Sequence, residues 1–165
     1  MAPFSLPGRL ARLLLPPVLS VLLSGCAFFS SAPPDLDMGD SLGARIASTA
    51  RSQIGAPYRF GGDSPAEGFD CSGLVQWAFT QNRVHVPRTV IEQATAGTPV
   101  RNSDTAPGDL VFFNTSLKMA SLHVGIATAK GRFVHSPSSG GKVREDRLSD
   151  PYWTSVYVKT RRLVP

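Results

Sequence analysis

One cysteine of this 165-residue chain stands where a side chain could do chemistry. Cys71 lies in the run Asp70-Cys71-Ser72-Gly73, between a glycine-rich loop and the apolar helical pattern of residues 74–79. Backbone N–H groups at a helix N-terminus carry partial positive charge, which stabilises a thiolate and lowers the pKa of a cysteine. The sequence therefore predicts a reactive thiol here. The alternative is a small, buried apolar side chain.

Two histidines far downstream, His123 and His135, could serve that thiol as a base and an orienting group. Each lies in a strand-like segment, and alternation along residues 122–128 puts His123 on a face with small neighbours. If the N-terminus of the Cys71 helix approaches that face, thiol and imidazole can meet. A hairpin of the two segments can place His135 beside His123. A thiolate, a base and an orienting residue are the parts of a cysteine hydrolase.

The same three side chains could instead ligate zinc, since cysteine and histidine are its usual ligands. The chain has no closely spaced pair such as HxxxH or CxxC. Nucleophilic catalysis is therefore favoured, and we expect neither a metal nor a cofactor. His85 has no partner motif and is predicted to lie in a loop or on the surface.

Residues 1–25 have the pattern of a bacterial export signal. Arg9 and Arg12 precede an apolar run, Leu13–Leu23, that is shorter than the roughly 20 residues needed to span a bilayer. The run ends in Leu23-Ser24-Gly25-Cys26, which resembles a lipobox. Cys26 is therefore predicted to be the lipid-carrying first residue of the mature protein, and an ordinary secretory signal is the alternative.

A lipid on Cys26 explains both cysteines without a disulfide. A Cys26–Cys71 bridge is the alternative in an oxidising compartment, but lipid modification uses up the Cys26 sulfur. Residues 26–40 are short, aperiodic and rich in Ser, Pro and Asp, so they are predicted to form a flexible tether. Residues 41–165 remain for one compact domain.

The charge of the chain identifies no partner. Removing residues 1–25 takes away two arginines and lowers the net charge from +5 to +3, with 15 Lys and Arg against 12 Asp and Glu. A nucleic-acid-binding protein would need a basic stripe with interleaved aromatic residues, and none is visible. We expect no nucleic-acid partner and a monomer.

Helical patterns come first in the predicted domain, and strand patterns follow. One helix is predicted over 41–54, a second over 71–82 with Asp70 as N-cap, and a short third one after the capping-box pattern of Thr89 and Glu92. Strands are predicted over 110–114, 122–128, 132–136, 142–147 and 156–163. This order predicts an α+β fold in which N-terminal helices pack on an antiparallel sheet of about five strands.

The sequence resembles the NlpC-type cell-wall cysteine peptidases, a papain-like family. The resemblance runs through nearly all of residues 45–163, and the ordered set of motifs is highly specific. The matching blocks are Tyr58-Arg59-Phe60-Gly61-Gly62, Gly68-Phe69-Asp70-Cys71-Ser72-Gly73-Leu74-Val75, Pro87-Arg88-Thr89, Pro107-Gly108-Asp109-Leu110-Val111-Phe112-Phe113, His123-Val124-Gly125-Ile126 and Phe133-Val134-His135.

The resemblance implies a lipid-anchored bacterial enzyme of the cell envelope that hydrolyses peptide bonds in the stem peptides of peptidoglycan. It also implies a role for each residue that matches the family's motifs. Cys71 would be the nucleophile, His123 the general base and acid, His135 the residue that orients His123, Tyr58 a contributor to the oxyanion hole, and Asp70 and Ser72 supports for the substrate.

Three questions stay open at this point. The D-alanyl–diaminopimelate cross-link is favoured as the bond cut, ahead of the γ-D-glutamyl–diaminopimelate bond. Ala27, and not Asp, follows the predicted lipidated Cys26, which favours the outer membrane, facing the periplasm. The alternatives to an endopeptidase are a non-catalytic wall-binding or scaffold lipoprotein on the same fold, and a related cysteine amidase or acyltransferase.

Overall fold

The computed structural model of the protein describes residues 41–115, 122–129, 131–138 and 141–165. The predicted export signal, the tether and the predicted lipid site Cys26 lie outside the described residues. Within these ranges no helix has both the length and the apolar character that a membrane crossing needs.

Three helices precede the main sheet, as the sequence predicts. They are α1 (Leu42–Arg51), α2 (Cys71–Gln81) and α3 (Val90–Gln93). Ser41 caps α1 by accepting a hydrogen bond from the backbone of Ala44, and the capping box of Thr89 and Glu92 is formed at α3. The helix predicted over 41–54 is too long at its C-terminal end, because residues 52–55 form turns.

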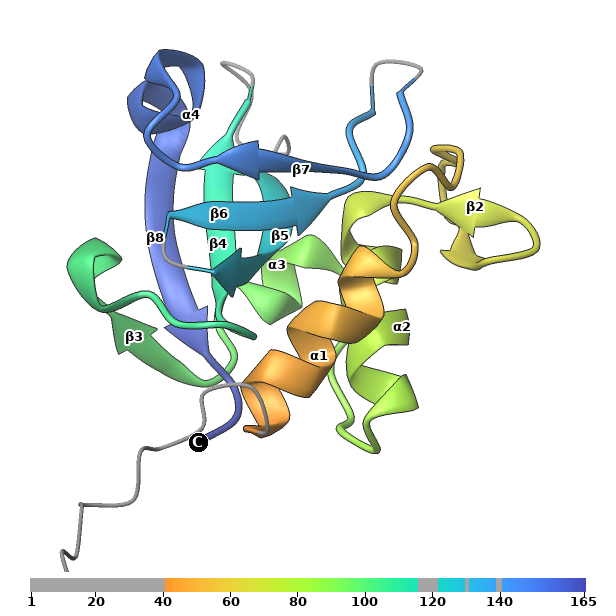
Figure 1. Ribbon diagram of the computed structural model, residues 1–165, viewed down its shortest axis with the longest axis horizontal. Coiled ribbons are helices and arrows are strands. Elements are labelled where there is room, and N and C mark those ends of the chain that lie inside the picture. The colour runs from red at the N-terminus through yellow and green to blue at the C-terminus, as the bar shows by residue number, and fades with distance from the viewer. Residues whose placement is uncertain (1–40, 116–121, 130, 139–140) are drawn as a thin grey trace, which may run out of the picture. The chain divides into compact units, whose positions relative to one another are not determined.

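The main sheet has six antiparallel strands in the order β3-β8-β4-β5-β6-β7 (Figure 1). All five predicted strands are present, and a sixth strand, β3, pairs with β8 at the edge. β3 has three residues with Pro99 in the middle, and proline within a run argues against a strand from sequence alone. The bounds are Thr98–Val100 for β3, Leu110–Asn114 for β4, Leu122–Ala129 for β5, Arg132–His135 for β6, Arg144–Arg147 for β7 and Tyr157–Arg162 for β8.

Besides β3, four short elements were not predicted. The glycine-rich loop before Cys71 contains a small antiparallel pair, β1 (Asp63–Ser64) and β2 (Gly68–Phe69), and a 3-10 turn η1 (Asn102–Asp104) follows β3. The helix α4 (Pro151–Val156) lies directly before β8. Asp150 caps α4 and proline occupies its first turn, which is a helix-start pattern that the sequence contains.

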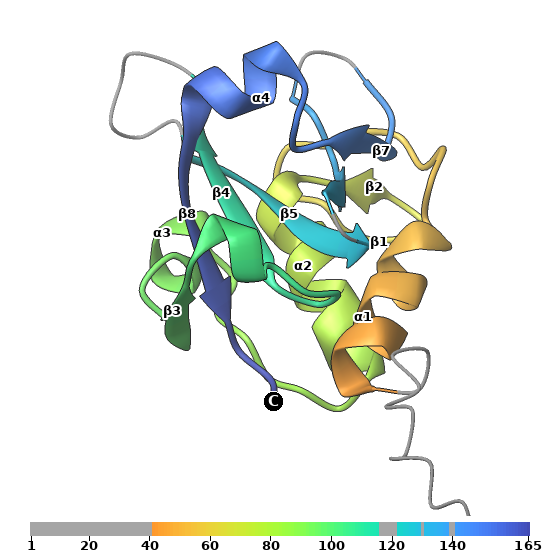
Figure 2. The same ribbon diagram turned by 60° about the vertical axis from the view of Figure 1, so that its left-hand side comes forward.

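Different helices cover the two faces of the sheet (Figure 2). Val124 and Ile126 of β5 pack into the core beneath α1 and α2. On the opposite face Trp153 of α4 packs against Phe113 and Phe133. The small face of β5, which carries His123, is therefore covered by α4. The helix α2 packs on the other face, in the core that contains Val124 and Ile126, and its first residue, Cys71, packs against that core.

Candidate active site

Cys71 is the first residue of α2, and the glycine-rich loop packs closely against this helix start. The Asp70 backbone N–H donates to the Gly62 carbonyl at 2.9 Å. A Cβ at position 73 would collide with that same carbonyl, so only glycine allows the loop to come this close. The Gly73 of the Asp-Cys-Ser-Gly motif is thereby explained by packing.

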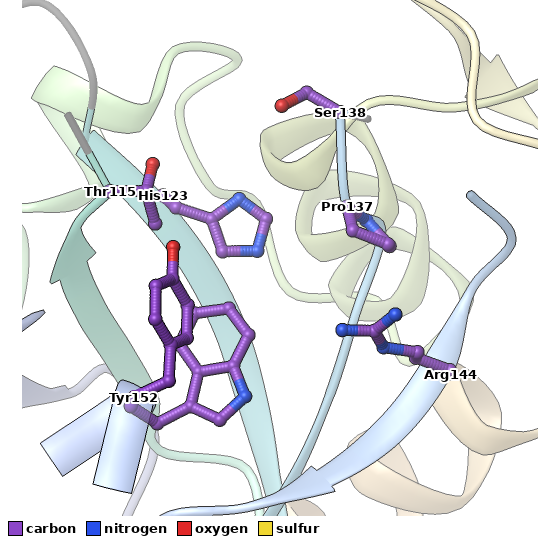
Figure 3. A pocket seen from close by; sticks show the side chains of 7 residues that line it. Thr115, His123, Pro137, Ser138, Arg144 and Tyr152 are labelled. Atoms are coloured by element: carbon purple, nitrogen blue, oxygen red, sulfur yellow. The ribbon is translucent and has the colours of Figure 1, made fainter. Parts of the chain in front are cut away.

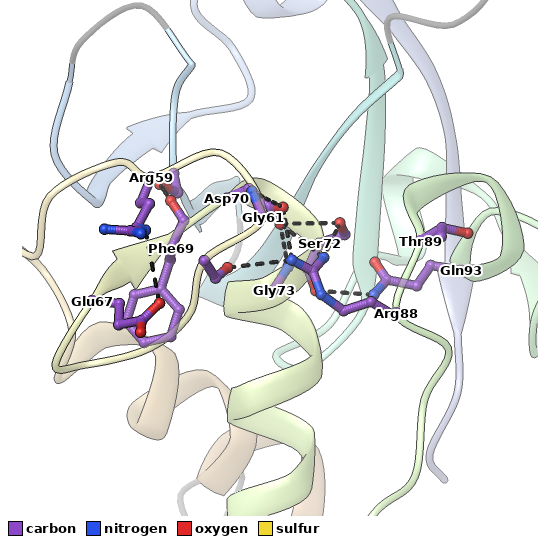
Figure 4. A network of polar contacts seen from close by, with 12 residues as sticks. Arg59, Gly61, Glu67, Phe69, Asp70, Ser72, Gly73, Arg88, Thr89 and Gln93 are labelled. Atoms are coloured by element: carbon purple, nitrogen blue, oxygen red, sulfur yellow. Dashed lines mark hydrogen bonds and ion pairs between the residues drawn. The ribbon is translucent and has the colours of Figure 1, made fainter.

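A polar network holds the helix start in place (Figure 4). Asp70 accepts hydrogen bonds from the Gly73 backbone at 2.6 Å and from both terminal nitrogens of Arg88, at 2.8 and 3.0 Å. The Ser72 hydroxyl donates to Asp70 Oδ1 and accepts from Arg88. The hydrogen bonds from Arg88 and the Gly73 backbone outweigh burial and lower the pKa of Asp70.

The structure thus places Asp70 and Ser72 behind the helix start, where they bond Arg88 and each other. Both residues thereby help to fix the start of α2, where Cys71 lies. Their direct support of a substrate stays a prediction.

The thiol of Cys71 is half-buried and lies beside β5. The Val124 backbone N–H, next to His123 on β5, is near enough to the Cys71 sulfur to favour its thiolate. Burial raises the pKa of Cys71, and the nearby Asp70 carboxylate adds to this, while backbone N–H groups oppose it. The prediction that the helix start lowers this pKa is therefore wrong for the free site, because burial outweighs the helix.

The two histidines are joined in a relay that ends at a carboxylate. His123 Nε2 lies 2.8 Å from His135 Nδ1, and His135 Nε2 lies 3.0 Å from Asp146 Oδ2. The same Asp146 oxygen accepts from Trp153 Nε1 at 3.0 Å and from Arg144 Nε at 3.1 Å. His135 is fully buried and His123 almost so, and the expected pairing of His135 with His123 is present.

The relay assigns the ring protons. Burial lowers the pKa of His123 to about 3 and that of His135 to about 4, so both rings are neutral near pH 7. The Asp146 carboxylate can only accept, which places the single N–H of His135 on Nε2. His135 Nδ1 then accepts from His123 Nε2, and the lone pair of His123 is left on Nδ1. His123 thus has one defined nitrogen, Nδ1, that can accept a proton.

Tyr58 lies close to the thiol. Its pKa is raised by burial first, and then by the negative charges that Cys71 and Asp70 carry when ionised. The hydroxyl has no hydrogen-bond partner among the described residues. No hydrogen bond between Cys71 and His123 occurs among them either. Catalytic hydrogen bonds are commonly loose before substrate binds.

A pocket of about 330 Å³ opens beside His123 (Figure 3). Its described lining residues come from β5, β7, α4 and the segments that follow β4 and β6. They are Thr115, His123, Pro137, Ser138, Arg144, Tyr152 and Trp153. A substrate that reaches His123 can therefore extend along this side of the ring.

The described residues show no group of three or more His, Cys, Asp or Glu side chains arranged to hold a metal ion. Both ring nitrogens of His135 are in hydrogen bonds, with His123 and Asp146. His135 has no lone pair left for zinc in this arrangement, which argues against the ligand set Cys71, His123 and His135. His85 is exposed, as predicted.

Sequence reasoning missed Asp146, Trp153 and Arg88. Asp146 belongs to a charged run, 142–147, that has the pattern of an ordinary solvated strand. Its role depends on the register of β7 with β6, where Asp146 lies opposite Phe133 and so beside the His135 pair. Arg88 occurs in the Pro-Arg-Thr motif, but its partner Asp70 is far away in sequence. Only tertiary pairing reveals either contact.

N-terminal helices packed on an antiparallel sheet, a cysteine at a helix start and a pair of histidines on the neighbouring strands β5 and β6 define a papain-like cysteine peptidase fold. The NlpC/P60 family matches residues 55–162, and the chain belongs to this family.

Relatives of known name agree. The chain is 42% identical to the murein DD-endopeptidase MepH of Escherichia coli K12 over 68% of this chain and 42% of that protein. It is 41% identical to the gamma-DL-glutamyl hydrolase of Bacillus subtilis 168 over 71% of this chain and 28% of that protein. It thus spans less than half of both proteins. With the probable endopeptidase NlpC of E. coli K12 it shares 34% identity over 88% of this chain and 96% of that one.

A solved structure supports the fold. NlpC2 from Trichomonas vaginalis superposes with a TM-score of 0.69 at 31% identity, over 77% of this chain and 49% of that one.

Proposed function

We propose that the protein is a peptidoglycan endopeptidase that hydrolyses stem-peptide or cross-link amide bonds with Cys71 as nucleophile. The observation that carries this proposal is the relay His123–His135–Asp146, which starts on β5 beside the thiol and runs across β6 to β7. A scaffold protein would not need a buried base held in one tautomer. The names of the relatives, an endopeptidase of murein among them, give the substrate class.

The reaction begins from neutral partners. Because burial raises the pKa of Cys71 and lowers that of His123, the resting pair is a thiol and an imidazole. His123 Nδ1 takes the thiol proton as the sulfur attacks the substrate carbonyl. These pKa directions favour a neutral resting pair over a thiolate–imidazolium ion pair.

The tetrahedral intermediate needs donors for its oxyanion. The Cys71 backbone N–H at the start of α2 and the Tyr58 hydroxyl supply them, and a preorganised donor is worth about 3 kcal/mol in the transition state. The His123 imidazolium then protonates the leaving amine, the C–N bond breaks and a thioester remains. His123 next takes a proton from water, which attacks the thioester and releases the acid and the thiol.

The predicted lipid on Cys26 and the tether 26–40 complete the proposal. They anchor the domain in the cell envelope, at the outer membrane facing the periplasm, within reach of peptidoglycan. Two relatives of nearly equal identity are named for different bonds, a DD-endopeptidase and a gamma-DL-glutamyl hydrolase. The D-alanyl–diaminopimelate cross-link is our first candidate.

The test is digestion of purified sacculi by the full chain, with the released muropeptides analysed by mass spectrometry. Wild type is expected to remove cross-linked dimers. The activity of Cys71→Ala should fall below about 10⁻³ of the wild-type activity, since no nucleophile remains. Its melting temperature should change little. Undiminished digestion by Cys71→Ala would contradict the mechanism, and unchanged muropeptides from folded wild type would favour the scaffold alternative.

A further inference from the structure

The pocket beside His123 lies on one defined side of the reaction centre. Its described lining comes from the histidine strand, from β7 and from α4, and includes no residue of α2 or of the Tyr58 loop. Under the proposed function, the acyl part of the substrate lies over the start of α2, where the oxyanion donors are. The leaving amine takes its proton from His123 and so lies on the other side. The pocket therefore receives the leaving-group part of the substrate.

Arg144 is the only Lys or Arg among the described residues that line this pocket, and no Asp or Glu lines it there. Figure 3 shows its guanidinium directed into the pocket from the side opposite Tyr152. Nε and Nη2 of Arg144 bond the same oxygen of Asp146, at 3.1 and 3.0 Å. Nη1 has no hydrogen-bond partner among the described residues, and the side chain is 55% exposed. A guanidinium with a free edge binds carboxylates through paired hydrogen bonds.

The two candidate bonds differ in the group next to the scissile nitrogen. In a D-alanyl–diaminopimelate cross-link, the carbon that bears the leaving amine also carries a free carboxylate. In a γ-D-glutamyl–diaminopimelate bond, that carbon carries the carboxyl group that continues the stem peptide as an amide. The cross-link therefore has an anion beside the scissile nitrogen. The γ-D-glutamyl–diaminopimelate bond lacks this anion wherever the stem peptide extends beyond diaminopimelate.

We propose that Arg144 binds the free carboxylate adjacent to the scissile nitrogen and so selects the cross-link over the γ-D-glutamyl bond. The proposal rests on the endopeptidase function proposed above and adds a specificity-determining residue to it. Tyr152, half-exposed on the opposite wall, packs against the aliphatic chain of diaminopimelate. Arg144 keeps its bond to Asp146 while Nη1 takes the substrate.

The test uses two cross-linked peptide dimers that differ in one group. One has the carboxylate beside the scissile nitrogen free, and the other has it as a primary carboxamide. The full wild-type chain is expected to cleave the carboxylate dimer with a kcat/KM at least tenfold higher than that for the carboxamide dimer. The reason is that a charge-assisted hydrogen bond is lost with the amide. In Arg144→Gln this ratio should fall to about one. Arg144→Lys should keep part of it, because the charge remains without the paired geometry.

The ratio separates binding from a structural role. Losing the Arg144 contact to Asp146 can slow the histidine relay, but that slows both substrates equally and leaves the ratio unchanged. Arg147→Gln is the matched control, because Arg147 is an exposed arginine on the same strand and does not line the pocket. It should leave both rate and ratio as in wild type.

Three results would overturn the proposal while leaving the endopeptidase intact. They are equal cleavage of both dimers by wild type, an unchanged ratio in Arg144→Gln, and faster cleavage of a γ-D-glutamyl–diaminopimelate tetrapeptide than of the cross-link. If wild type cleaves nothing, calorimetry of the two dimers with full-length Cys71→Ala tests carboxylate binding independently of the endopeptidase activity. Tighter binding of the carboxylate form supports the Arg144 site even then, and equal binding overturns it.

Discussion

At the scale of single residues, the chemistry depends on where one proton sits. His135 lies between His123 and Asp146, and its two nitrogens face an imidazole and a carboxylate. Because a carboxylate only accepts, the N–H bonds of both rings point towards Asp146 and leave the lone pair of His123 on Nδ1. In the proposed mechanism Asp146 therefore acts through two rings, without touching the substrate.

Asp146→Asn tests this relay. The amide can donate to His135 Nε2, which allows both N–H bonds to reverse and puts a proton on His123 Nδ1, where the lone pair is needed. We expect kcat to fall about 100-fold or more with KM nearly unchanged, by the logic of a catalytic triad whose carboxylate is replaced. Kinetics on a cross-linked peptide measure this.

Asp104→Asn is the control for Asp146→Asn. Asp104 is an aspartate of the turn η1 that pairs with Arg101 and lies outside the site. A full rate in Asp146→Asn would show that the relay does not set the tautomer of His123.

The sequence indicates the nucleophile and the histidine pair but not their support. Cys71 follows an N-cap residue, and His123 and His135 occupy strands of clear alternation, so local patterns find them. Asp146 and Arg88 acquire their roles from partners in distant elements. Such contacts require the register of β6 with β7 and the path of the loop, which no local pattern contains.

At the scale of elements, the close pairing of β5 and β6 is what brings the histidines together. Gly125 of β5 faces β6. A Cβ at this position would stand 2.5 Å from Phe133 Cδ2, 2.9 Å from the Val134 carbonyl and 3.3 Å from His135 Cβ. The strands can pair in this register only because position 125 has no side chain.

Gly125→Ala is therefore expected to push β6 away from β5. Overpacking of a filled interior costs about 1–3 kcal/mol of unfolding free energy, and the shift of His135 should lower kcat at least tenfold. Chemical denaturation and peptide hydrolysis measure the two effects.

Gly131→Ala is a useful comparison for Gly125→Ala. Its φ of 74° makes alanine strained, yet a Cβ there has nothing within 4 Å. It should lose stability and keep kcat. If both variants keep kcat, the close packing at Gly125 does not position His135.

Most of the longer elements were predictable, and the four-residue α3 was too because of its capping box, whereas the six-residue α4 was missed. The five longer strands and the two longer helices follow from periodicity and capping. The edge strand β3 contains Pro99, and β1 and β2 have two residues each, so their strand character comes from the partners they pair with. The helix α4 matters most among the missed elements, because its Trp153 stacks on His123 with ring centroids 5.9 Å apart.

At the scale of the whole molecule, the site makes folding stability depend on pH. His123 and His135 are buried as neutral rings with pKa values lowered to about 3 and about 4. The unfolded chain protonates both near pH 6.5, so it binds more protons than the folded one below that pH. Unfolding free energy is therefore fully present above about pH 6.5 and is lost as the pH falls towards 4.

Each histidine should contribute a loss of up to about 1.4 kcal/mol per pH unit in this window. The carboxylates Asp70 and Asp146, with lowered pKa values, lose their stabilisation only below about pH 4, so the window above it isolates the histidines. Urea denaturation of the full chain from pH 7 to 4.5 measures the slope. His135→Gln should roughly halve it, whereas the same substitution at exposed His85 should not change it. A pH-independent stability across this window would mean that the buried relay already carries a proton at neutral pH, and the assignment of His123 as a neutral base would have to be given up.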